Sequence, residues 1–387
     1  MNKWIQFKEQ PLRFLKDIIL KPKRVEMNYS SLSPYTHLLY TGENITGFSH
    51  LNLWIPHFIE ANIDFLVFVR NLKLFHFLKK EYPHITVLFA KSQTELDVYL
   101  QQLPFLKACF YPSNTGKNLH LLHFNHLKHI FIGHGDSDKT ASVHKYFRVY
   151  DENWTAGEAH IDRFRNAGFN FLGLENIRVG RPNLKEILEL SEVGWKERFG
   201  GKINLLYLST WEGVVSEQDY TSVSMIHTVF NTIYTTFDEI NIKLHPWIGR
   251  RESNLLNTSK VLEKSLKEKN IKFSIAKKDT NINILIEKAN IFICDISAVV
   301  TDCLAANAPI FVYIPKNKGI KLSKSKMGYE DYTYVFSTVD ELVTKIDTVL
   351  GGNDYLREKR EEAMQYVLGK EETLQNQFTK QLINIKN

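Results

Sequence analysis

One stretch, residues 289–313, constrains the fold more than any other part of the chain. It opens with the apolar run Ile291–Cys294, which is typical of a strand buried on both faces of a parallel sheet. The polar residues Asp295 and Ser297 end this run, a helical pattern of apolar residues follows, and a second apolar run closes the stretch. The spacing therefore predicts a βαβ unit with an Asp-x-Ser turn at the carboxyl end of its first strand.

The position of this turn indicates ligand binding, because open α/β sheets bind ligands just outside the carboxyl ends of their strands. A helix amino terminus at that place offers unpaired N–H groups and a partial positive charge, which suit a phosphate. In this interpretation Ser297 caps the helix and donates its hydroxyl, and Asp302, one turn further along, reaches ribose hydroxyls. The alternative is an ordinary serine N-cap on an ordinary helix.

Strand and helix patterns alternate along most of the remaining chain, which predicts parallel sheets covered by helices. The first series has strands at His37–Thr41, Asp64–Arg70, Ile85–Ala90, Ala108–Tyr111 and His129–Gly133. The second series has strands at Ile203–Leu208, Ile240–His245 and Ile271–Ile275 and then enters the stretch described above. We therefore predict two facing Rossmann-like α/β domains, 31–185 and 186–387, with a cleft between them, and a last helix able to pack back on the first domain.

Composition narrows the class of protein without selecting a function. The 387 residues are 43% hydrophobic, which suffices for two cores, and the formal charge of +6 fits an anionic ligand, a membrane surface or weak nucleic-acid binding. The three cysteines show no metal-binding spacing and fit a reducing cytoplasm. Neither a signal-peptide pattern nor a run of about 18 apolar residues is visible. Residues 1–30 are basic and amphipathic, and they either lie on an anionic membrane or pack on the body as a terminal helix.

The first histidine candidate follows the last strand of the first series. There an apolar strand ends in Gly-His-Gly, and the glycines on both sides let a ligand approach His134 closely. Imidazole titrates near neutrality, so His134 can act as a general base, and Lys139 adds a cation in the same loop. The alternative is a histidine that hydrogen-bonds within its own turn.

The second histidine candidate, His245, is the last residue of a predicted strand. The next residue is a proline, which cannot continue the strand. Arg250 and Arg251 come next, and arginine suits bidentate recognition of phosphate. Ser209 and Thr210 follow another strand of the same series and can point into the same cleft. The alternatives are a histidine bonded within its turn, a solvated arginine loop, and Ser and Thr that only form a turn.

Five segments in fixed order carry a resemblance to a known family. They are His134-Gly135 with Lys139, Gly180-Arg181-Pro182, Leu208-Ser209-Thr210-Trp211, Lys243-Leu244-His245-Pro246, and Cys294-Asp295-Ile296-Ser297-Ala298 with Asp302. Over roughly residues 128–315 the chain resembles the CDP-glycerol glycerophosphotransferases of teichoic-acid and capsule synthesis. Each motif is weak alone, but five in this order are specific.

The resemblance implies a GT-B fold, CDP-glycerol as donor, a lipid-linked saccharide acceptor, and a place on the inner face of the cell membrane. His134, His245 and Lys139 would be catalytic, and the donor would be bound by Ser297, Asp302, Asp295, Thr210, Arg250 and Arg251. No cofactor, metal or nucleic acid is expected, because no metal motif is present and positive side chains can take the place of a cation. The short two-domain core favours a primer or linker step over long-chain polymerisation.

The chain also departs from the family pattern. Ile296 and Ala298 replace a tyrosine and a serine, Glu212 replaces a frequent arginine, and Gly-Asp-Ser-Asp separates His134 from Lys139. These departures leave other donors open, among them CDP-ribitol and the nucleotide sugars of GT-B glycosyltransferases. A non-enzymatic adaptor that binds a membrane or nucleic acid by charge is the third alternative, and it would make His134 dispensable.

Overall fold

The computed structural model describes residues 34–138, 143–270, 272–278, 280–316, 318–320 and 322–386. The basic segment 1–30 and Lys139 therefore lie outside the described residues. The chain forms two compact units. The first contains the chain up to His134, Val149–Glu152 and the end from Leu382 onward, and the second contains Gly135–Arg148 and Asn153–Gln381. Within the described ranges, no helix combines the length and apolar character needed to cross a bilayer.

The first sheet has seven strands in the order β3-β2-β1-β4-β5-β6-β7. They are β1 (His37–Thr41), β2 (Phe65–Val69), β3 (Val87–Phe89), β4 (Ala108–Tyr111), β5 (Lys128–Phe131), β6 (Glu152–Thr155) and β7 (Glu175–Arg178). The pairings among β1 to β5 are all parallel, and β1 is buried along its whole length between β2 and β4. The five strands predicted for this half are confirmed, while β6 and β7 were not predicted from the sequence.

Helices follow the strands of this half as the patterns predict. They are α2 (Phe48–Asn52), α3 (Ile55–Glu60), α4 (Leu72–Glu81), α5 (Gln93–Leu100) and α6 (Glu158–Asn166). Two short helices, α2 and α3, follow β1, and α3 has a proline in its first turn. A capping box between Ser92 and Glu95 fixes the start of α5.

The second sheet has six strands in the order β10-β9-β8-β11-β12-β13, and all of their pairings are parallel. They are β8 (Asn204–Leu208), β9 (Glu239–Lys243), β10 (Phe273–Ile275), β11 (Ile291–Asp295), β12 (Ile310–Tyr313) and β13 (Tyr334–Phe336). Every residue of β11 is buried, as the continuous apolar run predicts. The predicted α/β class with two parallel sheets is thus confirmed.

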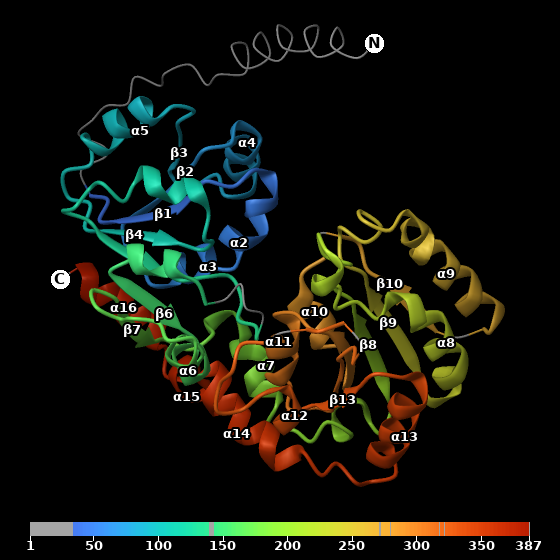
Figure 1. Cartoon of the computed structure of the whole chain (residues 1–387). Coiled ribbons are helices and arrows are strands. Elements are labelled where there is room, and N and C mark those ends of the chain that lie inside the picture. Colours follow the sequence, from blue (N-terminus) through green and yellow to red (C-terminus); the bar gives the residue numbers. More distant parts are fainter. Residues whose placement is uncertain are drawn as a thin grey trace, which may run out of the picture. The chain divides into compact units, whose positions relative to one another are not determined.

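Helices cover both faces of the second sheet (Figure 1), with α8 packed on α13 and α11 packed on α10 and α14. The helices from residue 185 onward are α7 (Lys185–Leu190), α8 (Val223–Ile233), α9 (Thr258–Glu268), α10 (Ile282–Ile286), α11 (Val299–Leu304), α12 (Tyr329–Tyr332), α13 (Val339–Leu350), α14 (Arg357–Leu368), α15 (Lys370–Leu374) and α16 (Gln377–Lys386). The last of them, α16, contacts the first sheet, because the Phe378 ring lies 5.5 Å from that of Trp154 in β6. The buried apolar side chains of the strands and of the helices that cover them form one hydrophobic core.

The strand orders define one switch point in each sheet. In the first sheet the chain moves outward from β1 through β2 and β3 and returns to the other side of β1 with β4. In the second sheet β8 and β11 are the corresponding neighbours. Connections leave these neighbouring strands in opposite directions, which opens a crevice at their carboxyl ends where such folds bind ligands. Ligand-binding residues are therefore expected in the segments that follow β1, β4, β8 and β11.

The crossover segment after β7 is held tightly by α15. Gly180 has a positive φ of 74°, and a Cβ added there would lie 2.3 Å from the hydroxyl of Thr373. The N–H of Arg181 donates to the same hydroxyl at 2.5 Å. Glycine at 180 is therefore required both by the backbone conformation and by the close approach of α15.

Replacing Gly180 by Ala should lower the free energy of unfolding by about 3 kcal/mol, because left-handed strain and a steric clash add together. Gly168 is the matched control, since its φ is 68° and nothing lies within 4 Å of the added Cβ. Gly168→Ala should cost about 1 kcal/mol from the left-handed strain alone. Urea denaturation of the two variants measures both free energies of unfolding. Equal losses would contradict a steric requirement for glycine at position 180.

Candidate functional site

The carboxylate of Asp295 organises the switch point of the second sheet. It lies at the end of β11 and is fully buried. It accepts hydrogen bonds from the N–H of Thr210 at 2.8 Å, the N–H of Ser222 at 3.0 Å and the hydroxyl of Thr221 at 3.1 Å. The segment after β8 and the start of α8 are thereby both tied to β11. Because no part of Asp295 is exposed, its geometry suits a residue that shapes the site rather than one that touches a ligand.

Burial raises the pKa of Asp295 to about 7, against the hydrogen bonds from Ser222, Thr210 and Thr221, which favour the ionised form. An ionised carboxylate that is desolvated to this degree is costly, and the cost would be larger without its hydrogen-bond donors. The geometry of Thr210, one of the residues predicted to bind the donor, therefore depends on Asp295.

The predicted N-cap at Ser297 is wrong. α11 begins at Val299 with Ala298 as its N-cap residue, and no side chain caps it. The hydroxyl of Ser297 donates back to the carbonyl of Asp295 at 3.3 Å, and the Ser297 carbonyl accepts from the N–H of Val300. The polar run after β11 forms a tight turn before the helix starts, and the serine side chain is used within that turn.

Asp302 is engaged by a basic residue from the crossover segment. Its carboxylate lies 3.1 Å from the guanidinium of Arg181, and both side chains are largely buried. Burial raises the pKa of Asp302, although the charge of Arg181 opposes the shift. The sequence predicted a contact between this carboxylate and ribose, and the structure adds a partner that orients it.

The residues after His134 form a buried ion-pair cluster within the second unit. Both Asp136 and Asp138 contact the guanidinium of Arg163 in α6, and all three side chains are buried. The hydroxyl of Thr301 in α11 donates to the carbonyl of Asp136 at 3.0 Å. Burial opposes ionisation of Asp136, but the charge of Arg163 outweighs it and lowers the pKa. The unusual Gly-Asp-Ser-Asp sequence thus has a defined structural partner.

Gly135, which follows His134 directly, approaches the start of α11. A Cβ added to Gly135 would lie 2.9 Å from the Cβ of Ala298. Glycine at 135 is therefore what lets the backbone pass this close to Ala298.

The segment after β9 carries the second predicted histidine. β9 ends two residues before His245, whose N–H donates to the hydroxyl of Ser209 at 3.0 Å. The rings of Trp211 and Trp247 lie 6.3 and 6.1 Å from the imidazole, centre to centre. The guanidinium of Arg250 lies 4.8 Å from the centre of the Trp247 ring. The strand ends of β8 and β9 therefore bring His245, Ser209 and Arg250 into one aromatic-lined group.

Glu212, where the family has a frequent arginine, fixes the loop that carries both arginines. Its carboxylate is fully buried and accepts from the N–H groups of Gly249, Arg251 and Glu252 at 3.2, 2.7 and 3.0 Å. Burial opposes ionisation, but these hydrogen bonds hold the pKa of Glu212 below its ordinary value. The Arg251 side chain is held by Asp219 and Glu252. Of the predicted pair, Arg250 is the more exposed residue.

His134 belongs to the first unit and is exposed at the end of the segment after β5. Its Nδ1 lies 2.8 Å from the carbonyl oxygen of Pro112. A carbonyl can only accept, so Nδ1 carries the proton, and Nε2 is the basic nitrogen of the neutral ring. This tautomer is the one that a general base acting through Nε2 requires.

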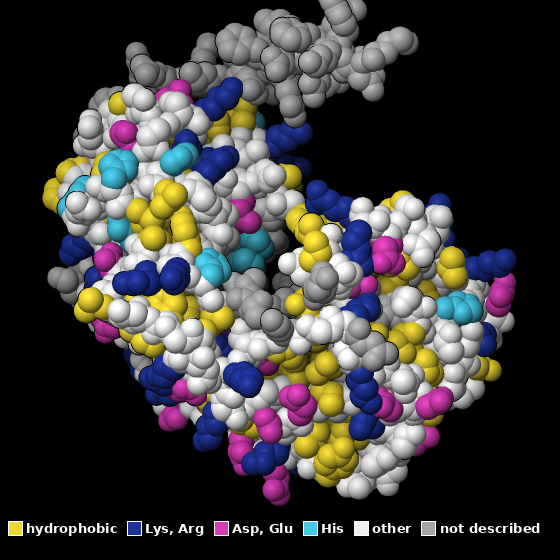
Figure 2. Space-filling view, in the orientation of Figure 1, with side chains coloured by type: hydrophobic (Ala, Val, Ile, Leu, Met, Phe, Trp, Pro, Cys, Tyr) yellow, Lys and Arg dark blue, Asp and Glu magenta, His cyan; other side chains and the backbone are white. Residues whose placement is uncertain are grey.

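Sequence reasoning missed two residues beside His134. The imidazole of His50 stacks on that of His134 with centres 3.6 Å apart, and the Glu43 carboxylate lies 2.8 Å from Nδ1 of His50. Ten of the fourteen histidines lie between residues 37 and 134, and histidine side chains are spread over one part of the surface in Figure 2. Histidine content alone therefore singles out none of them. The signal that could have found Glu43 is its place directly after β1, at the switch point of the first sheet.

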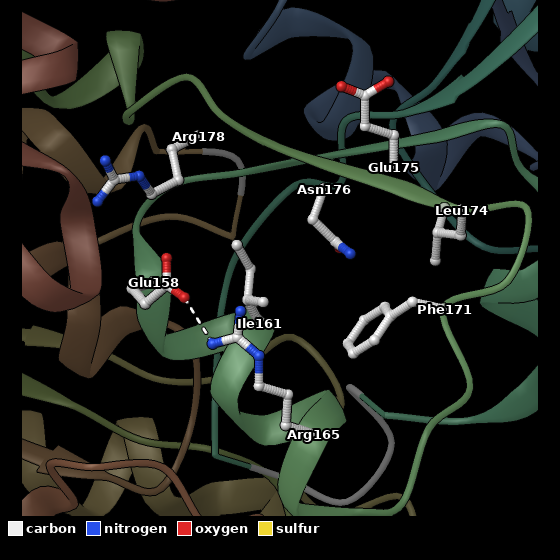
Figure 3. A pocket seen from close by; sticks show the side chains of 8 residues that line it. All are labelled: Glu158, Ile161, Arg165, Phe171, Leu174, Glu175, Asn176 and Arg178. Atoms are coloured by element: carbon white, nitrogen blue, oxygen red, sulfur yellow. Dashed lines mark hydrogen bonds and ion pairs between the residues drawn. The ribbon is translucent and has the colours of Figure 1, made fainter.

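An open pocket of about 460 Å³ lies elsewhere, between α6 and β7 (Figure 3). The ring of Phe171 and the amide of Asn176 point into it, and Arg165 pairs with Glu158 at its edge. No predicted site residue lines this pocket. Among the described residues no group of three or more His, Cys, Asp or Glu side chains is arranged to hold a metal ion.

Comparison with known proteins supports the fold. No family model matches the chain, and no curated protein matches its sequence. The wall teichoic acid polymerase TagF, in a structure soaked for 15 minutes with CDPG, is similar over 100% of this chain and 99% of its own, with a TM-score of 0.58 and 16% identity. UDP-GlcNAc 2-epimerase from Neisseria meningitidis, bound to UDP-GlcNAc, is similar over 91% of this chain and 100% of its own, with a TM-score of 0.59 and 11% identity. At these identities the likeness concerns the fold, which is of the GT-B type.

Replacing Asp295 by Asn should change how stability depends on pH. The folded pKa of about 7 exceeds the ordinary 3.8, so between these values the unfolded chain releases a proton that the folded chain keeps. The native protein should therefore lose stability relative to the Asn variant as pH rises from about 4 to about 7, by up to about 1.4 kcal/mol per pH unit. Denaturation curves across this window measure the difference, and a flat difference would contradict the raised pKa.

Proposed function

We propose that this protein transfers glycerol phosphate from CDP-glycerol to a hydroxyl of a lipid-linked saccharide or glycerol-phosphate acceptor and releases CMP. The observation that carries the proposal is the His134 tautomer, because the hydrogen bond to Pro112 leaves Nε2 as a base. Two further facts support it. The five family-like segments occur in order, and the fold is similar to that of TagF over nearly the full length of both chains.

In the proposed reaction, Nε2 of His134 takes the proton of the acceptor hydroxyl. The acceptor oxygen then attacks the phosphorus that carries glycerol, and the bond from this phosphorus to the CMP oxygen breaks. CMP leaves with the electron pair of that bond. Lys139, outside the described residues, would lie near the transferred phosphoryl group.

The donor would be bound by residues of the second unit. His245 and Arg250 would steady the phosphates as negative charge develops on CMP, and Ser297 and Thr210 would contribute hydroxyls. Asp302, oriented by Arg181, would bind the ribose. Because Asp295 is buried and Arg251 is ion-paired, we assign these two residues to holding the surrounding segments in place.

The base assignment is tested by His134→Ala. Turnover of CDP-glycerol should fall by about 10²- to 10⁴-fold, the usual contribution of a general base, while donor binding is retained. Ser297→Ala should show the opposite pattern, with weaker donor binding. His227→Ala, an exposed histidine in α8, is the matched control. Near-native turnover by the His134 variant would refute the assignment.

A second candidate is a GT-B enzyme that uses a nucleotide sugar, because the epimerase bound to UDP-GlcNAc is similar over 91% of this chain. A screen of CDP-glycerol, CDP-ribitol and UDP-sugars separates the two. We expect turnover of CDP-glycerol alone, and we expect it to persist in EDTA, because cationic side chains supply the positive charge. Turnover of UDP-sugars, or a loss in EDTA restored by Mg²⁺, would contradict these expectations.

The same assay addresses the place of the reaction in polymer synthesis. We propose a primer or linker step at the inner face of the cell membrane, with one or a few glycerol phosphates added to each acceptor. Mass spectrometry of the products measures this number directly, and long ladders would refute the primer step.

A further inference from the structure

Three side chains of the first unit form a continuous group at the switch point of its sheet. Glu43 follows β1, and its carboxylate accepts from Nδ1–H of His50 at 2.8 Å and from the hydroxyl of Ser113 at 2.8 Å. The imidazole of His50 then stacks on His134, with ring planes 13° apart. The segments after β1, β4 and β5 thus each contribute to one arrangement around His134.

The backbone around Glu43 is shaped to keep its carboxylate in this place. A Cβ added to Gly47 would lie 2.7 Å from the Cβ and 3.0 Å from Oε2 of Glu43, so only glycine fits beside it. The backbone before His134 is held by Trp54, whose indole N–H donates to the carbonyl of Gly133. Glu43 and the backbone next to His134 are therefore each held in place by a neighbouring residue.

We propose that His50 and Glu43 are positioning residues for His134, in which the His50 ring fixes the plane of the His134 imidazole and Glu43 fixes His50. This proposal rests on the proposed function, since it assigns a role to His134 as base. The stacking stops the exposed ring from turning about its χ2 angle, so that Nδ1–H keeps its bond to Pro112 and Nε2 stays directed toward the acceptor.

The charge of Glu43 adds a second effect. Burial would raise the pKa of Glu43, but the hydrogen bonds and charges of its neighbours, His50 first among them, outweigh burial and keep the pKa below its ordinary value. The carboxylate is therefore ionised near neutrality. When His134 accepts the proton of the acceptor hydroxyl, the stacked rings gain one positive charge, and the nearby carboxylate stabilises it. The proton remains on Nε2 of His134 until it is released to solvent.

Two conservative variants separate these effects. His50→Gln keeps a donor for Glu43 but removes the stacked ring, and Glu43→Gln keeps the shape but removes the charge. Each should lower kcat on the order of 10- to 100-fold, the range found for residues that hydrogen-bond to metal-bound histidines. KM for CDP-glycerol should stay within about twofold. The matched control is His123→Gln with Asp97→Asn, a pair of an exposed histidine and a half-buried carboxylate in the same unit, which should leave kcat unchanged.

Nitrogen-15 NMR of the unliganded protein supplies a readout that needs no activity. In the native protein His134 should show the Nδ1–H tautomer, and in His50→Gln the two tautomers should mix. If His134→Ala retains turnover, the proposed function fails, and the tautomer measurement alone decides the positioning proposal. If His134→Ala is inactive but both Gln variants keep the native tautomer and kcat, the positioning proposal is overturned and the proposed function stands.

Discussion

The buried carboxylate of Asp295 is the interaction on which the second unit's site depends. A desolvated carboxylate is costly unless donors surround it, and here the donors come from two other segments, around Thr210 and Thr221. These hydrogen bonds therefore hold both segments at the carboxyl ends of β8 and β11. The first unit uses Glu43 in the same manner, since its carboxylate draws together the segments that follow β1 and β4. Asp295 is the last residue of its strand and Glu43 lies two residues after its strand, and each accepts hydrogen bonds from a neighbouring segment.

Three acidic residues that depart from the family pattern, Glu212, Asp136 and Asp138, have hydrogen-bond or ion-pair partners in the structure. Glu212 stands where the family has a frequent arginine, and it binds three backbone N–H groups of the loop that carries Arg250. Asp136 and Asp138 stand between the two motif residues of the first loop, and they share the guanidinium of Arg163. Breaking one member of such a buried set leaves an uncompensated charge, which is strongly destabilising. Glu212, Asp136 and Asp138 each hold a loop in place.

The two histidines occupy different settings. His245 lies beside two tryptophan rings that also contact each other, its N–H donates to Ser209, and its Nδ1 accepts from the N–H of Trp247 at 3.2 Å. His134 is anchored through its side chain, by a carbonyl on one nitrogen and by the face of His50. In the neutral rings, Nε2 of His134 is therefore the basic nitrogen, whereas Nε2 of His245 carries the proton and can donate. The contacts therefore support different roles for the two residues.

The sequence by itself determined the α/β class, the strand sites such as His37–Thr41 and Ala108–Tyr111, and the loops that carry the polar residues, because runs buried in parallel sheets leave a strong local pattern. It failed at β6 and β7, whose sequences ENWT and ENIR are mostly polar and contain no apolar run. It also misplaced the cap of α11, since the hydroxyl of Ser297 can bond within its own turn as well as to a helix. Only the tertiary structure decided that Glu43 meets His50, and His50 meets His134. Strand order brings together loops some ninety residues apart, and the contacts between such loops leave no periodicity in the sequence.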